Sequence, residues 1–300
     1  MNLPTHGSSA ALLVAGLGIA FFSGMDAVMK GLSLELGAYN TMLWRSLIGV
    51  VIAGFLFLRS RPAWPGKTVI RLHLLRGVVL SVMTFLFFWG LKHLPLAEAV
   101  GLTFVAPLLA LYLARILLQE IIGRQAVIAS LIGLLGAAII VYGRLSGEYG
   151  EDVEKGIIAV LMSAVLYAFN LILQRQQALV ARPPEIAFFQ NCTFVILYGS
   201  LAPFFAVIPP ATVLPTLTVA AMLSIVSLLM MSWAYARSPA NVLLPVEYTA
   251  FIWAALLGWL VFGEQVTPAT VMGTSMIVLG CITAARQKPL TDDDPRPVST

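Results

Sequence analysis

Residues 94–120 read LPLAEAVGLTFVAPLLALYLARILLQE, and this stretch decides the fold. It begins beside Pro95, continues as one apolar helical pattern with a proline in its middle, and stops at Glu120. A related stretch, SPANVLLPVEYTAFIWAALLGWLVFGE, lies 144 residues later at 238–264 and also pairs an early proline with a final glutamate. We therefore predict that one membrane unit is written twice in this chain, with a functional site between the copies.

The composition is that of a membrane protein. Of the 300 residues, 59% are hydrophobic and 11% are charged, whereas soluble domains carry about 25% charged residues. A soluble chain this apolar would have too little polar material to cover its surface. The two cysteines, Cys192 and Cys281, lie in apolar runs without the spacing of a metal site or a disulfide framework. The basic residues are scattered in short loops, so we expect the lipid bilayer, and no nucleic acid, as a partner.

Ten apolar segments are each about long enough to cross the hydrocarbon core, which takes about 20 residues. We predict that the first is a retained span, because it continues into Asp26 and Lys30 and shows no clean cleavage site. The polar, Pro-rich residues 287–300 are expected to form a disordered cytoplasmic tail. The predicted spans are 10–30, 39–58, 72–91, 97–118, 125–143, 156–174, 186–207, 216–236, 240–262 and 267–285.

The distribution of lysine and arginine predicts the orientation. Cytoplasmic loops carry an excess of these residues. With the N-terminus inside, eleven of them fall on the inner side and four on the outer side. Both termini are therefore predicted to be cytoplasmic. The outer four are Lys30, Lys92, Arg144 and Lys155.

The 144-residue offset divides the chain into two five-helix halves, residues 10–143 and 156–286. It maps Asp26 onto Asn170, a polar residue inside an apolar helix in each half. Five spans are an odd number, so the second half enters the membrane from the opposite side. Inverted repeats of this kind are common in secondary transporters. The predicted fold is an all-α integral membrane protein with ten transmembrane helices in two inverted five-helix repeats.

Three features together resemble a known family: Arg45 in the second span, the segment at 94–120, and the closing FGE at 262–264. Within two five-helix halves, they resemble the drug/metabolite transporter superfamily, and within it the EamA-type ten-span transporters. The resemblance covers residues 10–286. It implies the movement of amino acids, riboflavin, S-adenosylmethionine or other metabolites, by export or by uptake.

Charges inside the membrane are the first functional candidates, because each is costly, from about 2.5 kcal/mol upward, unless it faces a cavity or a partner. Asp26 and Arg45 lie nine or ten residues on either side of a predicted turn near residue 35. We expect them at one depth, where a carboxylate and a guanidinium can pair. Lys30 lies one helical turn after Asp26 and competes for that carboxylate. The pair fixes span 1 to span 2, binds or gates substrate, or does both.

Glu247 lies a third of the way into the span at 240–262, two residues after Pro245. A proline removes a backbone N–H and breaks the helical ladder, here near residue 241. Freed carbonyls and a carboxylate form a polar notch, which is where transporters place substrate or coupling ions. The alternative is a glutamate bonded to a neighbouring helix, and we favour the site.

Aromatic residues accompany these charges. Aromatic walls with a few polar groups suit a flat or amphipathic organic ligand. Tryptophan and tyrosine also mark membrane interfaces, which is the alternative interpretation. The predicted substrate-binding or gating residues are Asp26, Trp44, Arg45, Trp89, Phe104, Asn170, Trp233, Glu247 and Tyr248.

Other features are interpreted as structural. Glu120 and Glu264 end corresponding helices, where we expect polar turns at the membrane surface. Thr267 is predicted to cap the last helix. Gly136 and Gly273 belong to faces of small residues that let helices approach closely in lipid.

The chain carries no nucleotide-binding loop, no metal-binding cluster and no hydrolase motif, so we predict no enzyme, no cofactor and no metal. We predict a secondary transporter in the cytoplasmic (inner) membrane of a bacterium. It moves a small organic metabolite (an amino acid, a vitamin or a nucleoside-like cofactor) by alternating access, driven by a proton or a counter-substrate. The alternative within this fold is a flippase for a lipid or lipid-linked sugar. A membrane enzyme or sensor would need a nucleophile or metal set that the sequence does not show.

Overall fold

The structure is a computed structural model that describes residues 6–60, 64–118, 124–145, 152–235, 237 and 246–285. Over these residues the chain is helical and holds no strand, which confirms the all-α prediction. The predicted tail at 287–300 lies outside this part of the chain. The helices are α1 (His6–Arg59), α2 (Lys67–Gly90), α3 (Leu96–Thr103), α4 (Ala106–Leu118), α5 (Arg124–Leu145), α6 (Val153–Ala178), α7 (Pro183–Ser200), α8 (Ala202–Phe205), α9 (Leu214–Tyr235), α11 (Ala250–Phe262) and α12 (Pro268–Ala285).

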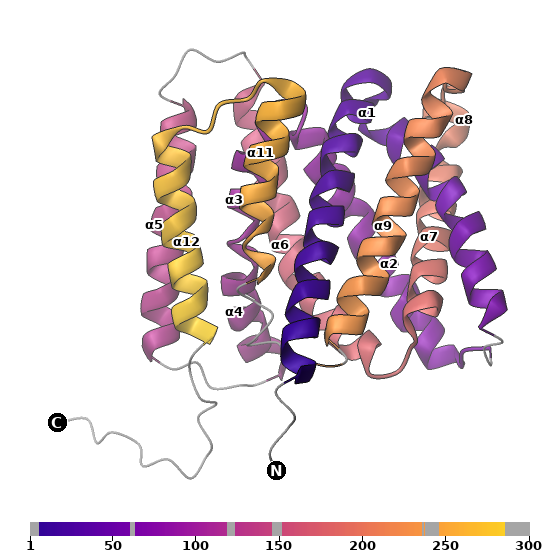
Figure 1. Cartoon of the computed structure of the whole chain (residues 1–300), viewed down its shortest axis with the longest axis horizontal. Coiled ribbons are helices and arrows are strands. Elements are labelled where there is room, and N and C mark those ends of the chain that lie inside the picture. Colours follow the sequence, from indigo (N-terminus) through magenta and orange to yellow (C-terminus); the bar gives the residue numbers. More distant parts are fainter. Residues whose placement is uncertain are drawn as a thin grey trace, which may run out of the picture.

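The element α1 doubles back on itself. Its 54 residues keep helical geometry except at Gly37, where φ is 78° and ψ is 153°. A positive φ is easily reached by glycine because it has no Cβ. The sequence predicted a loop near residue 35 between two spans, whereas the structure has a hinge at one residue. The first limb (6–36) rises and the second limb (38–59) descends, so α1 runs the length of the bundle twice (Figure 1).

The span predicted at 97–118 is wrong as one continuous helix, because it is broken into α3 and α4. Phe104 and Val105 form a turn between them, and the N–H of Phe104 bonds to the carbonyl oxygen of Gly101 at 3.3 Å. Pro107 accounts for the break, since it has no N–H to continue the ladder and its ring crowds the preceding turn.

A similar break precedes α11. Tyr248 and Thr249 form a turn there, and the 144-residue offset pairs them with Phe104 and Val105. The two breaks meet, because the ring centres of Phe104 and Tyr248 lie 5.3 Å apart in a T-shaped contact. The proline break expected near residue 241 lies outside the described residues.

The span predicted at 186–207 also ends early. Helix α7 stops at Ser200, and the single turn of α8 and an unwound stretch at 206–210 follow. Pro203 stands at the start of α8, where a missing N–H is tolerated, and cannot continue the ladder of α7. A short 3₁₀ turn, η1 (Ala211–Val213), then leads into α9.

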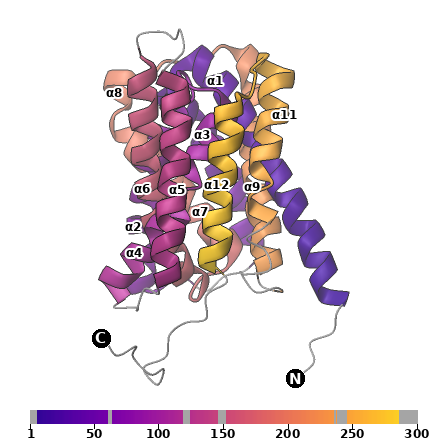
Figure 2. The same cartoon turned by 90° about the vertical axis from the view of Figure 1, so that its left-hand side faces the viewer.

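The long helices run between the same two ends of one bundle, called the upper and lower ends after Figure 1. Helix α1 begins at the lower end, and α12 begins at the upper end and finishes at the lower (Figures 1 and 2). Helix α1 packs along α9 and α7, α2 along α6, and α5 along α12. Each of these pairs joins residues 10–143 to residues 156–286, so the two predicted halves share one core.

The small-residue packing predicted for α5 and α12 is confirmed. A Cβ on Gly136 would collide with the carbonyl oxygen of Gly273, and a Cβ on Gly273 would collide with that of Gly136. The two backbones therefore touch at this point. Close contact between glycines is a typical way for helices to associate in lipid.

The outer surface of the bundle is apolar. By length and composition, four of the described helices can cross a membrane, and four shorter apolar helices accompany them. Large apolar side chains face outward, among them Val51, Phe55 and Leu58 on the second limb of α1, which expose between 66% and 72% of their surface. A soluble monomer rarely exposes apolar patches of this extent. The chain is therefore a multi-pass membrane protein.

Candidate functional site

The candidate charges of α1 are buried without a direct ion pair. Asp26 on the first limb and Arg45 on the second limb each expose 5% of their surface. Each lies within electrostatic reach of the other, but no ion pair within 4 Å joins them among the described residues. Arg45 Nη1 donates to Ser224 Oγ at 3.4 Å, and Arg45 Cζ lies 5.8 Å from the ring centre of Phe194. The sequence predicted the burial of both charges, and the structure keeps them apart.

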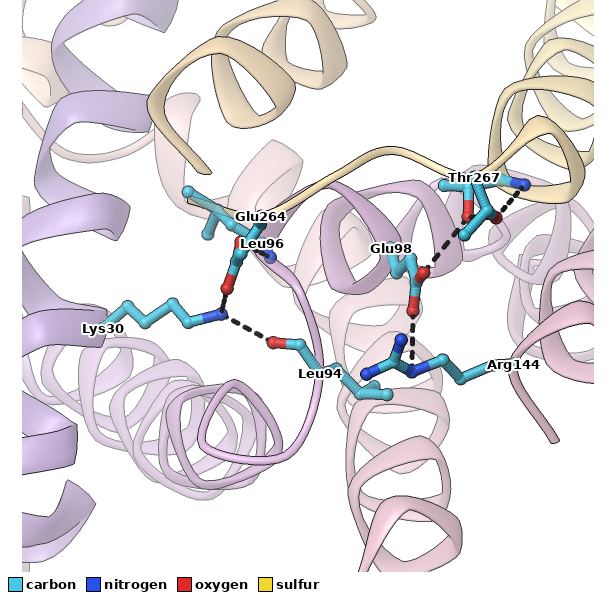
Figure 3. A network of polar contacts seen from close by, with 8 residues as sticks. Lys30, Leu94, Leu96, Glu98, Arg144, Glu264 and Thr267 are labelled. Atoms are coloured by element: carbon cyan, nitrogen blue, oxygen red, sulfur yellow. Dashed lines mark hydrogen bonds and ion pairs between the residues drawn. The ribbon is translucent and has the colours of Figure 1, made fainter. Parts of the chain in front are cut away.

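Lys30 does not compete for Asp26, contrary to the sequence prediction. Its Nζ donates to the carbonyl oxygen of Leu94 at 2.7 Å and forms an ion pair with Oε1 of Glu264 (Figure 3). Glu264 Oε2 accepts a hydrogen bond from the N–H of Leu96 at 2.8 Å. Glu264 was expected to close a helix only, yet it connects the segment after α11 to α1 and to the start of α3.

The end of α11 has the backbone geometry that presents Glu264. Gly263 has a left-handed φ of 66°, which reverses the chain, and the N–H of Glu264 bonds to the carbonyl oxygen of Gly258 at 3.1 Å. A Cβ on Gly258 would lie 2.8 Å from Glu264 Oε2, so the glycine leaves room for the carboxylate. The FGE sequence at 262–264 therefore builds the turn and supplies the charge.

A second buried carboxylate lies beside this ion pair (Figure 3). Glu98 on α3 exposes 2% of its surface, pairs with Nε of Arg144 at 3.3 Å, and accepts from Thr270 Oγ1 at 3.3 Å. The N–H of Thr270 donates to Thr267 Oγ1 at 3.1 Å, which confirms the predicted cap of α12. The residues joined here are called the upper-end network: Lys30, Leu94, Leu96, Glu98, Arg144, Glu264, Thr267 and Thr270.

Arg76 of α2 is the counterpart of Arg45 in burial, and it also exposes 5% of its surface. Its Nε donates to Asn170 Oδ1 at 2.9 Å, and its Nη1 donates to Gln177 Oε1 at 2.5 Å. Both amides belong to α6. Asn170, predicted as a site residue from its match to an acid in the first half, is thus a hydrogen-bond partner of Arg76.

These contacts continue toward the lower end. Gln177 Nε2 lies 2.6 Å from His73 Nδ1, and His73 Nε2 lies 3.0 Å from Glu185 Oε1. The chain of bonds connects α2, α6 and the start of α7. The residues joined are called the lower-end network: His73, Arg76, Asn170, Gln177 and Glu185.

Glu247 and Tyr248 lie at the break before α11, and both are half-buried. Tyr167 of α6 lies within electrostatic reach of Glu247 and Asp26, and also of Tyr248. Tyr248 in turn contacts Phe104. Candidate residues from both predicted halves therefore lie around the phenol of Tyr167.

The three candidate tryptophans lie elsewhere. Trp44 Nε1 donates to a backbone carbonyl after α8 at 2.9 Å, and the Trp89 ring centre is 4.8 Å from that of His93 at the upper end of α2. Trp233 exposes 38% of its surface near the lower end of α9, with the Cζ of Arg237 4.0 Å from its ring centre. Trp44 and Trp89 are partly buried against the main apolar core, so among the three only Trp233 has the exposure typical of a membrane interface.

Sequence reasoning missed the neutral residues that surround the charges. Tyr167 had a signal, because it lies three residues before Asn170 in an apolar span and shares its helical face. Ser224 and Phe194 have no comparable signal. Glu120, predicted as a structural helix end, lies outside the described residues.

Comparison with known families gives one result over nearly the whole chain. The model of the family described as the EamA-like transporter family matches residues 9–142 and, separately, residues 154–286. The two matches fall on the two halves inferred from the 144-residue offset.

Curated relatives over most of the chain are named as transporters. The chain is 27% identical over 284 residues to the pseudopaline exporter CntI of Pseudomonas aeruginosa (strain UCBPP-PA14), covering 93% of this chain and 97% of that protein. It is 24% identical to a riboflavin transporter of Rhizobium johnstonii, covering 92% of this chain and 90% of that protein. It is 21% identical to an S-adenosylmethionine uptake transporter of Rickettsia felis, covering 87% of each.

A solved structure shares the fold. The crystal structure of another protein superposes on this chain with a TM-score of 0.61 at 21% sequence identity. The match covers 92% of this chain and 96% of the other. At this identity the likeness shows the fold alone.

Proposed function

The chain belongs to the EamA-like transporter family, and on this premise we propose that it is a secondary transporter for a small organic metabolite. It works by alternating access in the cytoplasmic membrane of a bacterium, and a proton or a counter-substrate supplies the energy. The bacterial relatives named for three different metabolites support the small-molecule class.

The upper-end network is the observation that carries the mechanism. Lys30 and Glu98 belong to the first half, Arg144 follows it directly in the last turn of α5, and Glu264 and Thr270 belong to the second half. By joining the two halves, these contacts are proposed to hold the upper end closed. Alternating access requires the same contacts to separate when that end opens, and rigid halves then move about the site between them.

We propose that the chain has ten spans, arranged as two inverted five-helix repeats. The repeats are the two halves, residues 10–143 and 156–286. The helix breaks at Phe104 and Tyr248, 144 residues apart, support this arrangement. The packing supports it too, because the contact of α1 with α9 has its counterpart in the contact of α6 with α2. The double match of one family model gives independent support.

The orientation is proposed from the basic residues. The basic residues at the lower end of the bundle all lie within five residues of a helix end: Arg59, Lys67, Arg71, Arg182 and Arg237. An excess of basic residues marks the cytoplasmic side. The lower end and both chain termini are therefore proposed to be cytoplasmic, and the upper-end network faces outward.

Asp26 and Arg45 are proposed to form one wall of the substrate site, and Glu247 and Tyr248 the other. Their burial inside apolar helices supports a site role, because an ionisable group in a membrane interior usually marks a substrate or ion pathway. Tyr167 joins the two walls by its proximity to acids on both.

The test is metabolite flux into proteoliposomes that contain the purified full chain. The substrates are those whose cellular levels change when the gene is deleted and recover when it is restored. Asp26→Asn and Glu247→Gln are each expected to reduce flux. Asp152→Asn, which changes a half-exposed acid directly before α6, is the matched control. Unchanged flux in both site variants would reject the site, and lipid scrambling without metabolite flux would favour a flippase.

A further inference from the structure

Arg45 is a buried cation whose hydrogen-bonding capacity is largely unused. A guanidinium carries five N–H donors in a planar fork. Among the residues that the structure describes, Arg45 makes one side-chain hydrogen bond, from Nη1 to Ser224 Oγ, and its length of 3.4 Å is at the weak limit. Its Nε is buried and has no hydrogen-bond partner within the same residues. The ring of Phe194 offers only a distant cation–π contact.

Other buried cations of this chain are treated differently. Arg76 has side-chain amides at both Nε and Nη1. Lys30 has a carboxylate and a backbone carbonyl. A buried charge without a partner is expensive, so a structural arginine would be expected to have partners like those of Arg76. Arg45 therefore resembles a binding group awaiting an anion.

Resting on the transport function above, we propose that Arg45 binds a carboxylate group of the transported metabolite. The fork of a guanidinium matches the two oxygens of a carboxylate and can donate to both. Arg45 lies between α1, α7 and α9, so a carboxylate bound there would contact both proposed halves.

The local charge favours a carboxylate over a phosphate monoester. Among the described residues, Arg45 is the one cation at this point, and the neighbours that contact it, Ser224, Phe194 and Tyr198, are neutral. One guanidinium offers a single positive charge, which is too little to hold both charges of a dianion away from water. A monoanion is the better match for a single guanidinium.

The first experiment identifies the metabolite class in cells. Metabolites are compared by untargeted mass spectrometry in cells without the gene, with the wild-type gene, and with Arg45→Gln. Metabolites that depend on the wild-type gene are expected to carry a carboxylate, and Arg45→Gln is expected to behave like the deletion. A dependent metabolite without a carboxylate overturns this proposal and leaves the transport function standing. If no metabolite depends on the gene, both proposals fail.

The second experiment tests the contact itself in proteoliposomes. The identified metabolite is compared with its own primary carboxamide, which removes the charge and keeps the shape. If a charged hydrogen-bond pair forms, the wild type should transport the carboxylate in preference to the carboxamide by about ten- to a hundredfold. Arg45→Gln is expected to bring this ratio close to one, and Arg45→Lys is expected to keep part of it, because a charge remains without the fork.

The preference ratio is measured within one preparation, so it does not depend on how much of each variant folds. Arg76→Lys is the matched control, because Arg76 is equally buried and lies in the lower-end network, and its ratio is expected to equal that of the wild type. A wild-type preference that survives in Arg45→Gln overturns the proposal.

Discussion

Arg45 and Arg76 are equally buried, but they differ in the number and length of their hydrogen bonds. Arg76 donates hydrogen bonds to the side-chain amide oxygens of Asn170 and Gln177, at 2.9 and 2.5 Å. Its Nε and Nη1 donors therefore have partners within the chain. Arg45 has one hydroxyl at 3.4 Å and an unpartnered Nε. Equal burial therefore accompanies very different hydrogen bonding. The proposed distinction between a structural arginine and a substrate-binding one depends on the number and geometry of the partners.

The same distinction holds for the buried acids. Glu98 and Glu264 are both paired within the upper-end network. Asp26, one helical turn from Lys30, has no hydrogen bond or ion pair within the part of the chain that the structure describes. Within the described residues, the charges of the two end networks have ionic or amide partners, whereas Asp26 and Arg45 between them have no close ionic partner, which supports the proposed interior site.

The largest expected difference between the two arginines is in stability. Arg76→Leu leaves two buried amide oxygens without a donor, and we expect it to lower the free energy of unfolding by about 2–4 kcal/mol. Arg45→Leu removes a charge that has no close partner. The free energy of unfolding of this variant should therefore equal or exceed that of the wild type. Denaturant titration in detergent measures both. Equal losses in the two variants would remove the distinction between them.

A smaller loss is expected when only one amide is removed. Gln177→Leu deprives Arg76 Nη1 of its acceptor and His73 Nδ1 of its neighbour, at a cost of about 1–3 kcal/mol. Gln176→Leu, at the adjacent exposed position of α6, is the control and should stay within about 0.5 kcal/mol of the wild type. The same titration is used, and a similar effect at both positions would mean that the lower-end network contributes little.

The smallest effect is expected at Ser224. Its hydroxyl makes a long hydrogen bond to Arg45, so Ser224→Ala should change the free energy of unfolding by less than about 1 kcal/mol. Substrate flux should stay within about threefold of the wild type, because the guanidinium and its charge remain. Flux in proteoliposomes is the measurement. A loss as large as that of Arg45→Gln would make Ser224 the principal partner of Arg45.

Much of the fold follows from short-range patterns. The apolar helices and the cap at Thr267 depend on residues close in sequence, and both predictions are confirmed. The break beside Pro107 was not predicted, because residues 97–118 were expected to form one span. The burial of Asp26 and Arg45 was predictable from their depth in apolar helices. The turn between them was predicted near residue 35 and lies at Gly37, but its form was not predictable, because one non-helical residue replaces the expected loop.

The partners of the charges depend on distant parts of the chain. Lys30 is one turn from Asp26, which made that pair the natural prediction, yet it binds Glu264 in the other half. The partner is set by the left-handed turn at Gly263 and the space beside Gly258, and neither is visible without the packed bundle. The offset matches Asn170 to Asp26, but the contact of Asn170 with Arg76 depends on how α2 lies against α6.

Alternating access is tested most directly by cross-linking the two halves at the upper end. In a chain with Cys192→Ser and Cys281→Ser, the pair Lys30→Cys and Glu264→Cys is joined by a short thiol-specific cross-linker that a reductant cleaves. The pair Asp152→Cys and Lys155→Cys, one turn apart at the start of α6, is joined in the same way as the control.

Flux in proteoliposomes is then measured before cross-linking, after it, and after reduction. Alternating access predicts that the cross-link at Lys30 and Glu264 stops transport, that reduction restores it, and that the control pair transports throughout. Full transport through a completely cross-linked upper end would contradict the account.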